Sequence, residues 1–304
     1  MDAVRIHEYG GPETLKFESG VPEPRLGERT VLIAATAASV NPIDWKMRSG
    51  ARQKDFPLTL PAILGRDVSG VVRAVGPEVR NFKPGERVLA FTVAAYAELV
   101  AVDDAICTHL PDGLDLADAA AIPLVVLTGD QLVRDAARLR KGQTVLITGA
   151  LGSVGRAALH VALKVGAQVI AGVRARQVDE ARLLGAADVV AIDDEAQVAR
   201  LPMVDAVADT VGGETAARLV AKLKPGGYFA YASALPEGLV AANPALRIVR
   251  VFARPDASKV REFADDLRDR RFVLPIGRRL PLRDAAEGHV LGERGGIGKI
   301  VLLA

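Results

Sequence analysis

The chain has 304 residues, half of them hydrophobic and a quarter charged, which is enough for two domains with separate cores. Lys and Arg number 39 and Asp and Glu 37, so the formal charge of +2 gives no electrostatic reason to expect nucleic acid or an anionic membrane as a partner. The single cysteine, Cys107, excludes an internal disulfide and a metal site built from several cysteines.

The first ten residues, MDAVRIHEYG, carry charges of both signs and lack the apolar run of a signal peptide. No later stretch approaches the roughly 20 apolar residues that are needed to span a bilayer. We therefore expect a cytoplasmic protein.

Short β-type runs, separated by turns that contain Gly and Pro, fill the first part of the chain. Strands are predicted over residues 30–40, 68–76, 86–91 and 97–102. Their spacing is typical of a small β domain. The sequence pattern then changes from strands to a helix, because residues 116–139 are rich in Ala and Leu at helical spacing.

Strands and helices alternate in the middle of the chain. The predicted strands are 144–148, 168–173, 188–192, 204–211 and 226–233, and the predicted helices are 153–166, 178–185, 196–200 and 214–224. This alternation implies parallel pairing through right-handed crossovers, so it predicts an α/β domain with a doubly wound parallel sheet.

The C-terminal part is predicted to continue with a strand at 246–255 and a charged amphipathic helix at 258–271. The remaining residues return to β-type sequence and end in a strand over 298–304. The chain is thus predicted to leave a β domain, build the α/β domain and come back.

The stretch TVLITGALGSVGRAALH, residues 144–160, indicates a strand, a glycine-rich turn and a helix. Gly152 and Gly155 take the last two positions of a G-x-G-x-x-G fingerprint, whereas Ala150 stands at the first position and Gly149 precedes it. A helix N-terminus at such a turn favours a phosphate, so we expect a bound dinucleotide. A methyl donor on the same fold and a turn without a ligand are the alternatives.

The end of the following strand indicates which dinucleotide binds. An acidic residue there would take the ribose 2′-OH of NAD, but the strand is followed by Arg174 and Arg176, and the first carboxylate is Asp179. Arginine binds a 2′-phosphate through charge-assisted hydrogen bonds. The pair favours NADP(H) over NAD, although either arginine alone is equally consistent with a solvated surface residue.

Six stretches in order along the chain carry a family resemblance. They are AASVNPIDWKMRSG, LGRDVSGVVRAVGPEVRNFKPGERV, AAIPLVVLTGDQLV, GQTVLITGALGSVG, LKPGGYFA and GKIVL. Together they resemble the medium-chain dehydrogenase/reductase superfamily, specifically its zinc-independent quinone oxidoreductase and alkenal reductase branches. The resemblance implies a Rossmann domain (122–256) inserted into a GroES-like β-barrel domain (1–121 and 257–304), with a small-molecule substrate bound in the cleft between them.

The resemblance also bears on zinc. Zinc-dependent relatives carry Cys at the position of Asn41 and a His-Glu pair at Arg66 and Asp67. Asn is a poor zinc ligand and Arg has no free lone pair, so no metal is expected. The four histidines are interpreted as structural or surface residues: His7, His109, His160 and His289.

Two candidate catalytic residues follow from the resemblance. Asn41 would hydrogen-bond near the nicotinamide ribose or the substrate, and its alternative is a turn residue before Pro42. Lys46 stands where alkenal reductases also carry Lys and quinone reductases often carry Tyr. It would bond the ribose hydroxyl or polarise a carbonyl oxygen, and an exposed surface lysine is the alternative.

The resemblance assigns the remaining candidates to the cofactor. Thr128 would reach the nicotinamide end, or else serve helix packing, and the backbone N–H groups of Ser153 and Val154 would bind the pyrophosphate. Ser233 and Phe252, at the ends of later strands, would lie near the cofactor, and Phe252 equally suits a dimer interface.

These residues predict a reaction class. Without a Lewis acid, alcohol oxidation loses its means of stabilising an alkoxide, whereas a conjugated carbonyl itself accepts the charge of a hydride. We therefore expect an NADPH-dependent, zinc-independent reductase of quinones or α,β-unsaturated carbonyls. A non-catalytic NADPH-binding sensor or structural protein is the alternative.

Three further expectations concern the proton donor, the rim of the site and the assembly. Tyr96 and Tyr231 are the only tyrosines considered as proton donors, and solvent is equally plausible. The short stretch at 92–95 replaces a longer loop that is common in relatives, which leaves the substrate size open. The resemblance implies a homodimer that pairs through the strand at 246–255.

Overall fold

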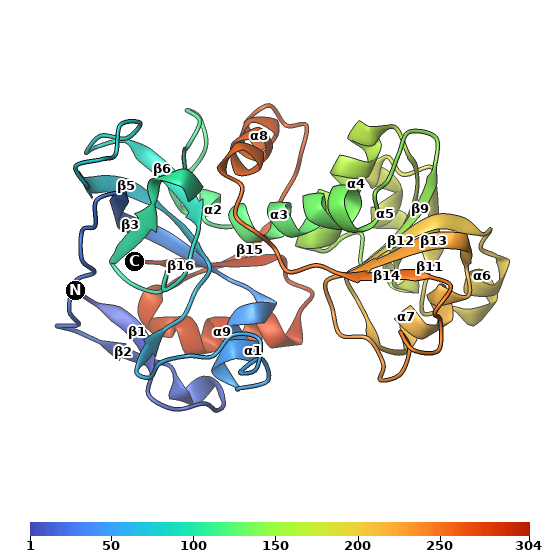
Figure 1. Cartoon of the computed structure of the whole chain (residues 1–304), viewed down its shortest axis with the longest axis horizontal. Coiled ribbons are helices and arrows are strands. Elements are labelled where there is room, and N and C mark those ends of the chain that lie inside the picture. Colours follow the sequence, from blue (N-terminus) through green and yellow to red (C-terminus); the bar gives the residue numbers. More distant parts are fainter. The chain divides into compact units, whose positions relative to one another are not determined.

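The computed structural model describes all of residues 1–304, which form two units (Figure 1). Unit 1 comprises Met1–Leu124 and Pro255–Ala304, and unit 2 comprises Val125–Arg254. The divisions predicted from the sequence lie after residues 121 and 256. The chain leaves unit 1 once and returns to it once.

Unit 1 is built on a seven-stranded sheet with the order β15-β16-β3-β5-β6-β8, in which β7 also pairs with β3. These strands are β3 (Thr30–Val40), β5 (Asp67–Val75), β6 (Arg87–Phe91), β7 (Leu99–Asp103), β8 (Cys107–His109), β15 (Ile276–Pro281) and β16 (Lys299–Leu303). A smaller sheet has the order β2-β1-β4, with β1 (Ala3–Ile6), β2 (Lys16–Glu18) and β4 (Ala62–Ile63). The strand β3 lies at the centre of the larger sheet because it pairs with three other strands, β16, β5 and β7.

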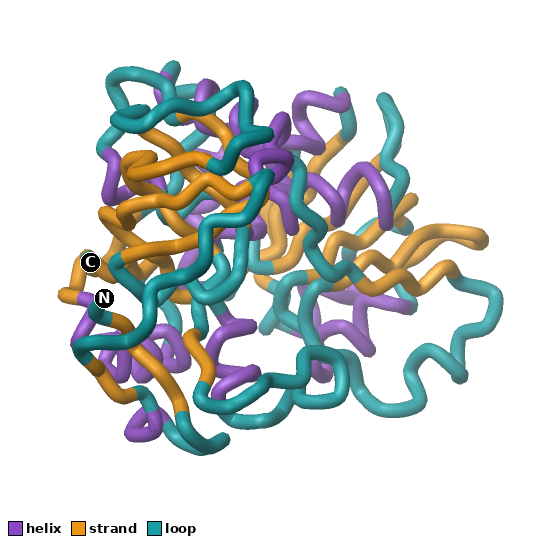
Figure 2. The backbone as a smooth tube through the Cα atoms, turned by 60° about the vertical axis from the view of Figure 1, so that its left-hand side comes forward, coloured by secondary structure: helices purple, strands orange, loops and turns teal.

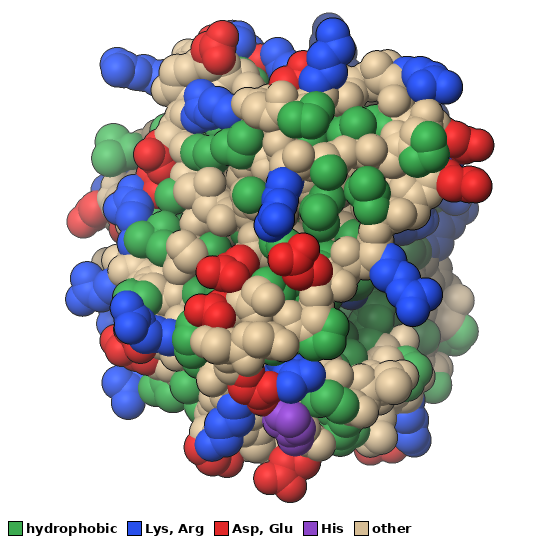
Figure 3. Space-filling model, turned by 90° about the vertical axis from the view of Figure 1, so that its left-hand side faces the viewer, with side chains coloured by type: hydrophobic (Ala, Val, Ile, Leu, Met, Phe, Trp, Pro, Cys, Tyr) green, Lys and Arg blue, Asp and Glu red, His purple; other side chains and the backbone are tan.

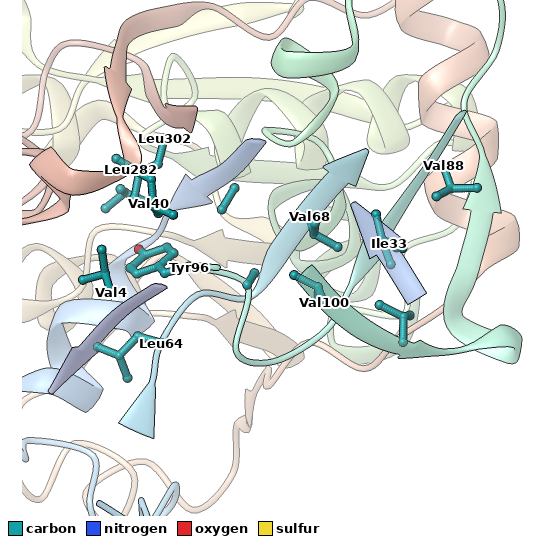
Figure 4. Close-up of a cluster of buried hydrophobic side chains, with 14 of the residues drawn as sticks. Val4, Ile33, Val40, Leu64, Val68, Val88, Tyr96, Val100, Leu282 and Leu302 are labelled. Atoms are coloured by element: carbon teal, nitrogen blue, oxygen red, sulfur yellow. The ribbon is translucent and has the colours of Figure 1, made fainter. Parts of the chain in front are cut away.

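The core of unit 1 brings together residues from both ends of the chain. Tyr96 is fully buried and lies among apolar side chains that include Val4, Leu64 and Leu302 (Figure 4). The helices of unit 1 are α1 (Pro42–Arg48), α2 (Leu116–Ala119), α8 (Ala257–Arg268) and α9 (Ala285–Arg294). The β-type interpretation of the last residues is wrong at α9, where Ala, Glu and Leu favour a helix that ends before Gly295.

Unit 2 contains an all-parallel sheet with the order β11-β10-β9-β12-β13-β14. The strands are β9 (Thr144–Thr148), β10 (Gln168–Val173), β11 (Asp188–Ala191), β12 (Val204–Asp209), β13 (Leu223–Tyr231) and β14 (Arg247–Arg250). The order reverses direction between β9 and β12, which makes this the switch point of a doubly wound sheet. The Rossmann-type sheet predicted from the alternation is confirmed.

The helices of unit 2 cover both faces of this sheet. Figure 1 shows α4 and α5 on one face and α6 and α7 on the other. Their bounds are α4 (Ser153–Val165), α5 (Val178–Ala181), α6 (Glu195–Arg200) and α7 (Gly213–Val220). The core cluster of unit 2 consists mostly of aliphatic side chains, such as Leu146 and Val207, and it includes the ring of Phe229.

Two elements predicted in unit 2 have different bounds in the structure. The helix predicted over 214–224 ends at Val220, and β13 begins at Leu223, because Pro225 disfavours a helical residue before it. The strand predicted over 246–255 is regular only over Arg247–Arg250. Residues 232–246 contain no helix or strand, and they therefore belong to the part of the tube that Figure 2 colours as loop.

The predicted helix at 116–139 is divided into three. It comprises α2, then α3 (Pro123–Gln131), and a π-helical turn at Leu132–Ala136. Against the expectation that no stretch reaches membrane-spanning length, Leu116–Ala136 is a 21-residue helical run with a mean hydropathy of 1.5. Since 78% of its most apolar window is buried inside the protein, a core helix accounts for the same pattern.

Charged side chains of both signs are interspersed on the face of the protein that Figure 3 shows. Ion pairs join charged side chains of unit 1, such as Arg29 with Asp104 at 2.7 Å and Arg279 with Asp118 at 2.6 Å. This face has no large region of a single sign.

Candidate functional site

The glycine turn lies at the carboxyl end of β9, next to the switch point of the sheet. Gly149 adopts a φ of +63°, and a Cβ on it would lie 2.5 Å from the Thr210 hydroxyl oxygen. A Cβ on Gly155 would lie 2.1 Å from the carbonyl oxygen of Gly149, so the helix packs directly on the turn. Because the left-handed residue is Gly149, the next position accepts Ala150, whose side chain is buried.

The turn presents the N-terminus of a long helix. Gly152 precedes α4 with a φ of −72°, and Ser153 and Val154 form the first turn of the helix, half-buried. Backbone N–H groups in a first turn have no carbonyl one turn earlier, and the helix dipole adds positive charge there. Gly152 carries no side chain that would hold a ligand away, so the cradle fits a dinucleotide pyrophosphate.

Arg174 and Arg176 follow β10 at the same carboxyl edge, and both side chains are exposed. Neither guanidinium forms an ion pair with the protein. A carboxylate that the sequence interpretation missed lies close by: Asp193, after β11, accepts a hydrogen bond of 2.8 Å from the backbone N–H of Ala175. Asp193 therefore orders the backbone between Arg174 and Arg176. In the sequence, the feature that could have identified it is its position directly after the strand that neighbours β10.

Asp209 is a second residue that sequence reasoning missed. This fully buried carboxylate ends β12, and its Oδ1 accepts a 2.7 Å hydrogen bond from the Thr148 hydroxyl at the end of β9. Its Oδ2 accepts a 2.6 Å hydrogen bond from Ser233, which follows β13. Asp209 therefore holds three strand ends together beside the glycine turn, and its position directly before the TVGG stretch was the signal.

Three other candidates lie in unit 2. Thr128 is buried on α3, and the next residue, Gly129, packs against α4 so closely that a Cβ there would lie 2.6 Å from Ala157. Phe252 follows β14, is 44% exposed, and carries the Arg250 guanidinium over its ring at 4.2 Å. Tyr231 is half-buried at the end of β13.

Asn41 and Lys46 belong to unit 1. Lys46 is half-buried on α1, whereas Asn41 is fully buried and precedes that helix. The Asn41 amide nitrogen donates to Asp67 at 2.8 Å, and its oxygen accepts from the Lys299 ammonium at 2.7 Å. Both polar ends of Asn41 are thus used inside unit 1, so a direct bond to a bound molecule would have to replace one of them.

The surroundings of Asp67 do not fit a zinc ion. Its Oδ2 accepts from Ser39 at 2.6 Å, its Oδ1 accepts from the backbone N–H of Leu124 at 2.7 Å, and Lys299 lies 4.0 Å away. Burial raises the pKa of the Asp67 carboxyl and lowers that of the Lys299 ammonium, and each charge opposes the other's shift. A buried ammonium beside Asp67 and Asn41 repels a second cation, and no group of three or more His, Cys, Asp or Glu side chains in the chain is arranged so that it could hold a metal ion.

A second buried network joins α1 to α9. The Tyr96 hydroxyl donates to Asp44 at 3.1 Å and lies 3.1 Å from Nε2 of His289, whose Nδ1 lies 3.1 Å from the Arg48 guanidinium. Because an arginine only donates, Nδ1 accepts and Nε2 carries the proton of a neutral imidazole. Arg48 also binds Glu293, at 2.7 Å.

Burial sets the protonation of this network. It raises the pKa of Asp44 to about 7 and lowers the pKa of His289 to about 3, the latter with help from the Arg48 charge. Burial, with the Asp44 charge, also raises the pKa of Tyr96 well above its usual value. A fully buried hydroxyl that already donates to Asp44 is poorly placed to give a proton to a bound substrate.

Comparisons with known proteins agree with this architecture. Residues 27–112 match the Alcohol dehydrogenase GroES-like domain family and residues 184–302 the Zinc-binding dehydrogenase family. The mouse Quinone oxidoreductase is 30% identical over 100% of this chain and 98% of its own length. The match to the pig Quinone oxidoreductase is 40% identical but spans 56% of this chain and about half of the relative's length, 52%.

Solved structures extend the similarity to the whole fold. The quinone oxidoreductase from Coxiella burnetii is 27% identical with a TM-score of 0.88, and it matches 100% of this chain and 99% of its own. The Escherichia coli quinone oxidoreductase complexed with NADPH is 25% identical with a TM-score of 0.86 over 100% of both chains. The chain therefore belongs to the medium-chain dehydrogenase/reductase superfamily of oxidoreductases, among the relatives of the quinone oxidoreductases.

Proposed function

We propose that this chain is an NADPH-dependent, zinc-independent oxidoreductase that transfers hydride to a quinone or an α,β-unsaturated carbonyl. The observation that carries the proposal is the turn opening at Gly149, which ends in a helix N-terminus and lies at the same sheet edge as Arg174 and Arg176. The Escherichia coli relative, described as complexed with NADPH, supports the choice of cofactor.

The residues of unit 2 supply binding and orientation. The N–H groups of Ser153 and Val154 take the pyrophosphate, and the two exposed arginines take the ribose 2′-phosphate. Asp209 keeps the Ser233 hydroxyl in place beside the cradle. Bound NADPH supplies the hydride, while the conjugated carbonyl of the substrate accepts the electron pair without a metal.

Unit 1 supplies candidates toward the substrate. We propose that Lys46, half-buried on α1, polarises a carbonyl oxygen or binds the ribose. Asn41 hydrogen-bonds to both Asp67 and Lys299, and we propose that it shapes the site by holding these two side chains in place. Tyr96 is buried against Asp44, so we propose that the proton that completes the reduction comes from solvent rather than from Tyr96.

Cofactor preference is tested by equilibrium titration with NADPH and with NADH. Replacement of Arg174 and Arg176 by Ala should weaken NADPH binding roughly tenfold or more for each charged hydrogen bond lost, and leave NADH binding nearly unchanged. Arg200→Ala, an exposed arginine on α6, is the matched control. Stronger binding of NADH by the wild type would contradict the choice of cofactor.

The reaction is tested by steady-state assays with NADPH and a panel of quinones, enones and alkenals. Turnover of at least one class is expected, and it should persist after the protein is treated with a chelator. Tight NADPH binding without turnover of any of them would contradict the enzymatic proposal and leave a non-catalytic NADPH-binding protein in its place.

A further inference from the structure

Arg66 differs from other buried and half-buried arginines of the chain, such as Arg48 and Arg156, because its guanidinium has no hydrogen-bond acceptor in the protein. Its Nε is buried without a partner, and neither terminal nitrogen bonds to a carboxylate or carbonyl. By contrast, Arg48 binds Gly10, His289 and Glu293, and Arg156 binds Leu151 and Glu180. Unsatisfied donors at a partly buried site require an explanation, and a ligand that is not part of the protein is one.

Aromatic side chains hold the guanidinium in place. The Arg66 Cζ lies 4.9 Å from the centre of the Phe91 ring and 5.8 Å from that of Phe56. The backbone is anchored as well, because the Arg66 carbonyl accepts a 2.8 Å hydrogen bond from Thr92, and Asp67 pairs with Phe91 in the sheet. The cation is thus positioned by contacts that leave its donors unused.

The nearby carboxylates attract Arg66 but do not bind it. Both oxygens of Asp67 are taken, by Ser39 and Asn41 on one side and by Leu124 on the other. Burial lowers the pKa of the Arg66 guanidinium and the charge of Asp44 opposes that shift, but the Oδ1 atom of Asp44 has no hydrogen-bond partner. The Arg66 side chain is half-buried, and Nε is the only one of its nitrogens that is both fully buried and unpartnered, so the unpartnered terminal nitrogens keep some exposure.

We propose that Arg66 binds the carbonyl oxygen of the substrate and stabilises the negative charge that hydride addition places on it. The inference rests on the proposed function. Hydride adds to the β-carbon of the conjugated carbonyl, the π electron pair moves to the oxygen, and the resulting enolate takes its proton from solvent. With a quinone the same addition gives an enolate of the ring, which reaches the hydroquinone when the ring carbon that received the hydride loses a proton to solvent and the oxygen gains one. Arg66 gives up no proton in this step, since a guanidinium stays charged at any working pH.

The short stretch 92–95 follows Phe91, the aromatic neighbour of Arg66, directly. Val93 is 58% exposed and Ala94 adopts a φ of +55° in a tight turn. The geometry thus favours a substrate whose oxygen approaches an accessible cation.

A non-reducible oxyanion tests the proposal without turnover. The probe is 4-nitrophenol, whose phenolate absorbs at a longer wavelength than its neutral form. Wild-type protein should bind the phenolate and lower the apparent pKa of the bound probe, whereas Arg66→Gln should bind it roughly 10- to 100-fold more weakly and abolish the shift, as the loss of a charge-assisted hydrogen bond requires.

Two further variants separate binding from structure. Arg66→Lys keeps the charge and should retain part of the shift, so it serves if the Gln variant fails to fold. Arg247→Gln is the matched control, since its Cζ also lies 4.9 Å from an aromatic ring, that of Tyr228, but on unit 2. It should leave the probe's affinity unchanged.

Cofactor binding makes the two proposals separable. NADPH affinity should be the same in Arg66→Gln and the wild type, while kcat for an enone should fall at least tenfold. A normal phenolate shift in the folded variant, or a loss of NADPH affinity in place of phenolate affinity, overturns the role of Arg66. Failure of the wild type to bind NADPH overturns the proposed function instead.

Discussion

Asp44 and His289 are linked through the Tyr96 hydroxyl, and burial shifts their pKa values in opposite directions. The folded chain holds the Asp44 proton to about pH 7, whereas the unfolded chain loses it near 3.8. Stability from this group is present at low pH and is lost as the pH rises through that range. His289 acts in the opposite sense, because the folded chain resists its protonation.

Asp44→Asn should remove the first of these dependences. The free energy of unfolding of the variant, relative to the wild type, should increase between about pH 4 and pH 7, by up to about 1.4 kcal/mol per pH unit. Urea unfolding at a series of pH values measures it. In His289→Gln the relative stability should instead increase as the pH falls below 6.5, and parallel curves for both variants would contradict the assignment.

Lys299→Met should leave the Asp67 carboxylate buried without its cation. The expected loss is about 3–5 kcal/mol in the free energy of unfolding, because an uncompensated buried charge is costly. Lys224→Met breaks a Lys–Asp pair that is 46% exposed on the lysine side and should cost about 1 kcal/mol or less. The double variant Lys299→Met/Asp67→Asn should recover part of the loss, and no recovery would show that Lys299 acts by packing alone.

At the scale of elements, the strand–turn–helix unit from β9 to α4 has two glycines with different roles. A Cβ on Gly155 would lie 2.1 Å from the carbonyl oxygen of Gly149, whereas a Cβ on Gly152 would lie 3.1 Å from the same oxygen. Gly155 therefore serves the packing of the helix on the turn, and Gly152 leaves room for a ligand.

The two alanine variants should separate these roles. Gly155→Ala should lower the free energy of unfolding by about 1–3 kcal/mol, as overpacking does. Gly152→Ala should cost less than about 1 kcal/mol at this N-cap position, yet weaken NADPH binding, because its methyl group would occupy the approach of the pyrophosphate. Thermal unfolding and NADPH titration give the two quantities, and full NADPH affinity in Gly152→Ala would contradict the cradle.

At the scale of the whole molecule, the chain forms two units with separate cores, and the sheet of unit 2 ends in an open edge. The strand β14 pairs only with β13, and Phe252 beyond it is 44% exposed. An unpaired edge strand is a template for another chain, so we propose that β14 pairs with a second copy of this protein.

Phe252→Asp tests this homodimer. Sedimentation velocity should show a dimer for the wild type and a monomer for the variant, because a carboxylate would be buried in the interface. NADPH affinity should stay the same. A variant that stays dimeric but binds NADPH weakly would assign Phe252 to the cofactor, the other role that its position suggests.

The sequence by itself determined the architecture and the glycine turn. The alternation of apolar strands with helices, and the spacing of Gly149, Gly152 and Gly155, are local patterns that imply the same elements in any context. Where a boundary was wrong, as at Pro225 and in α9, local signals for helix and strand competed within a few residues.

Only the tertiary structure decided the polar interior of unit 1 and the state of Arg66. Tyr96 meets His289 across 193 residues of sequence, and Arg48 meets the same imidazole across 241. No periodicity in the sequence encodes such contacts, since they depend on which strands pair and on how β16 returns to β3. Whether a charged side chain is buried, paired or free to bind follows from that pairing, because burial and distance set its electrostatic energy.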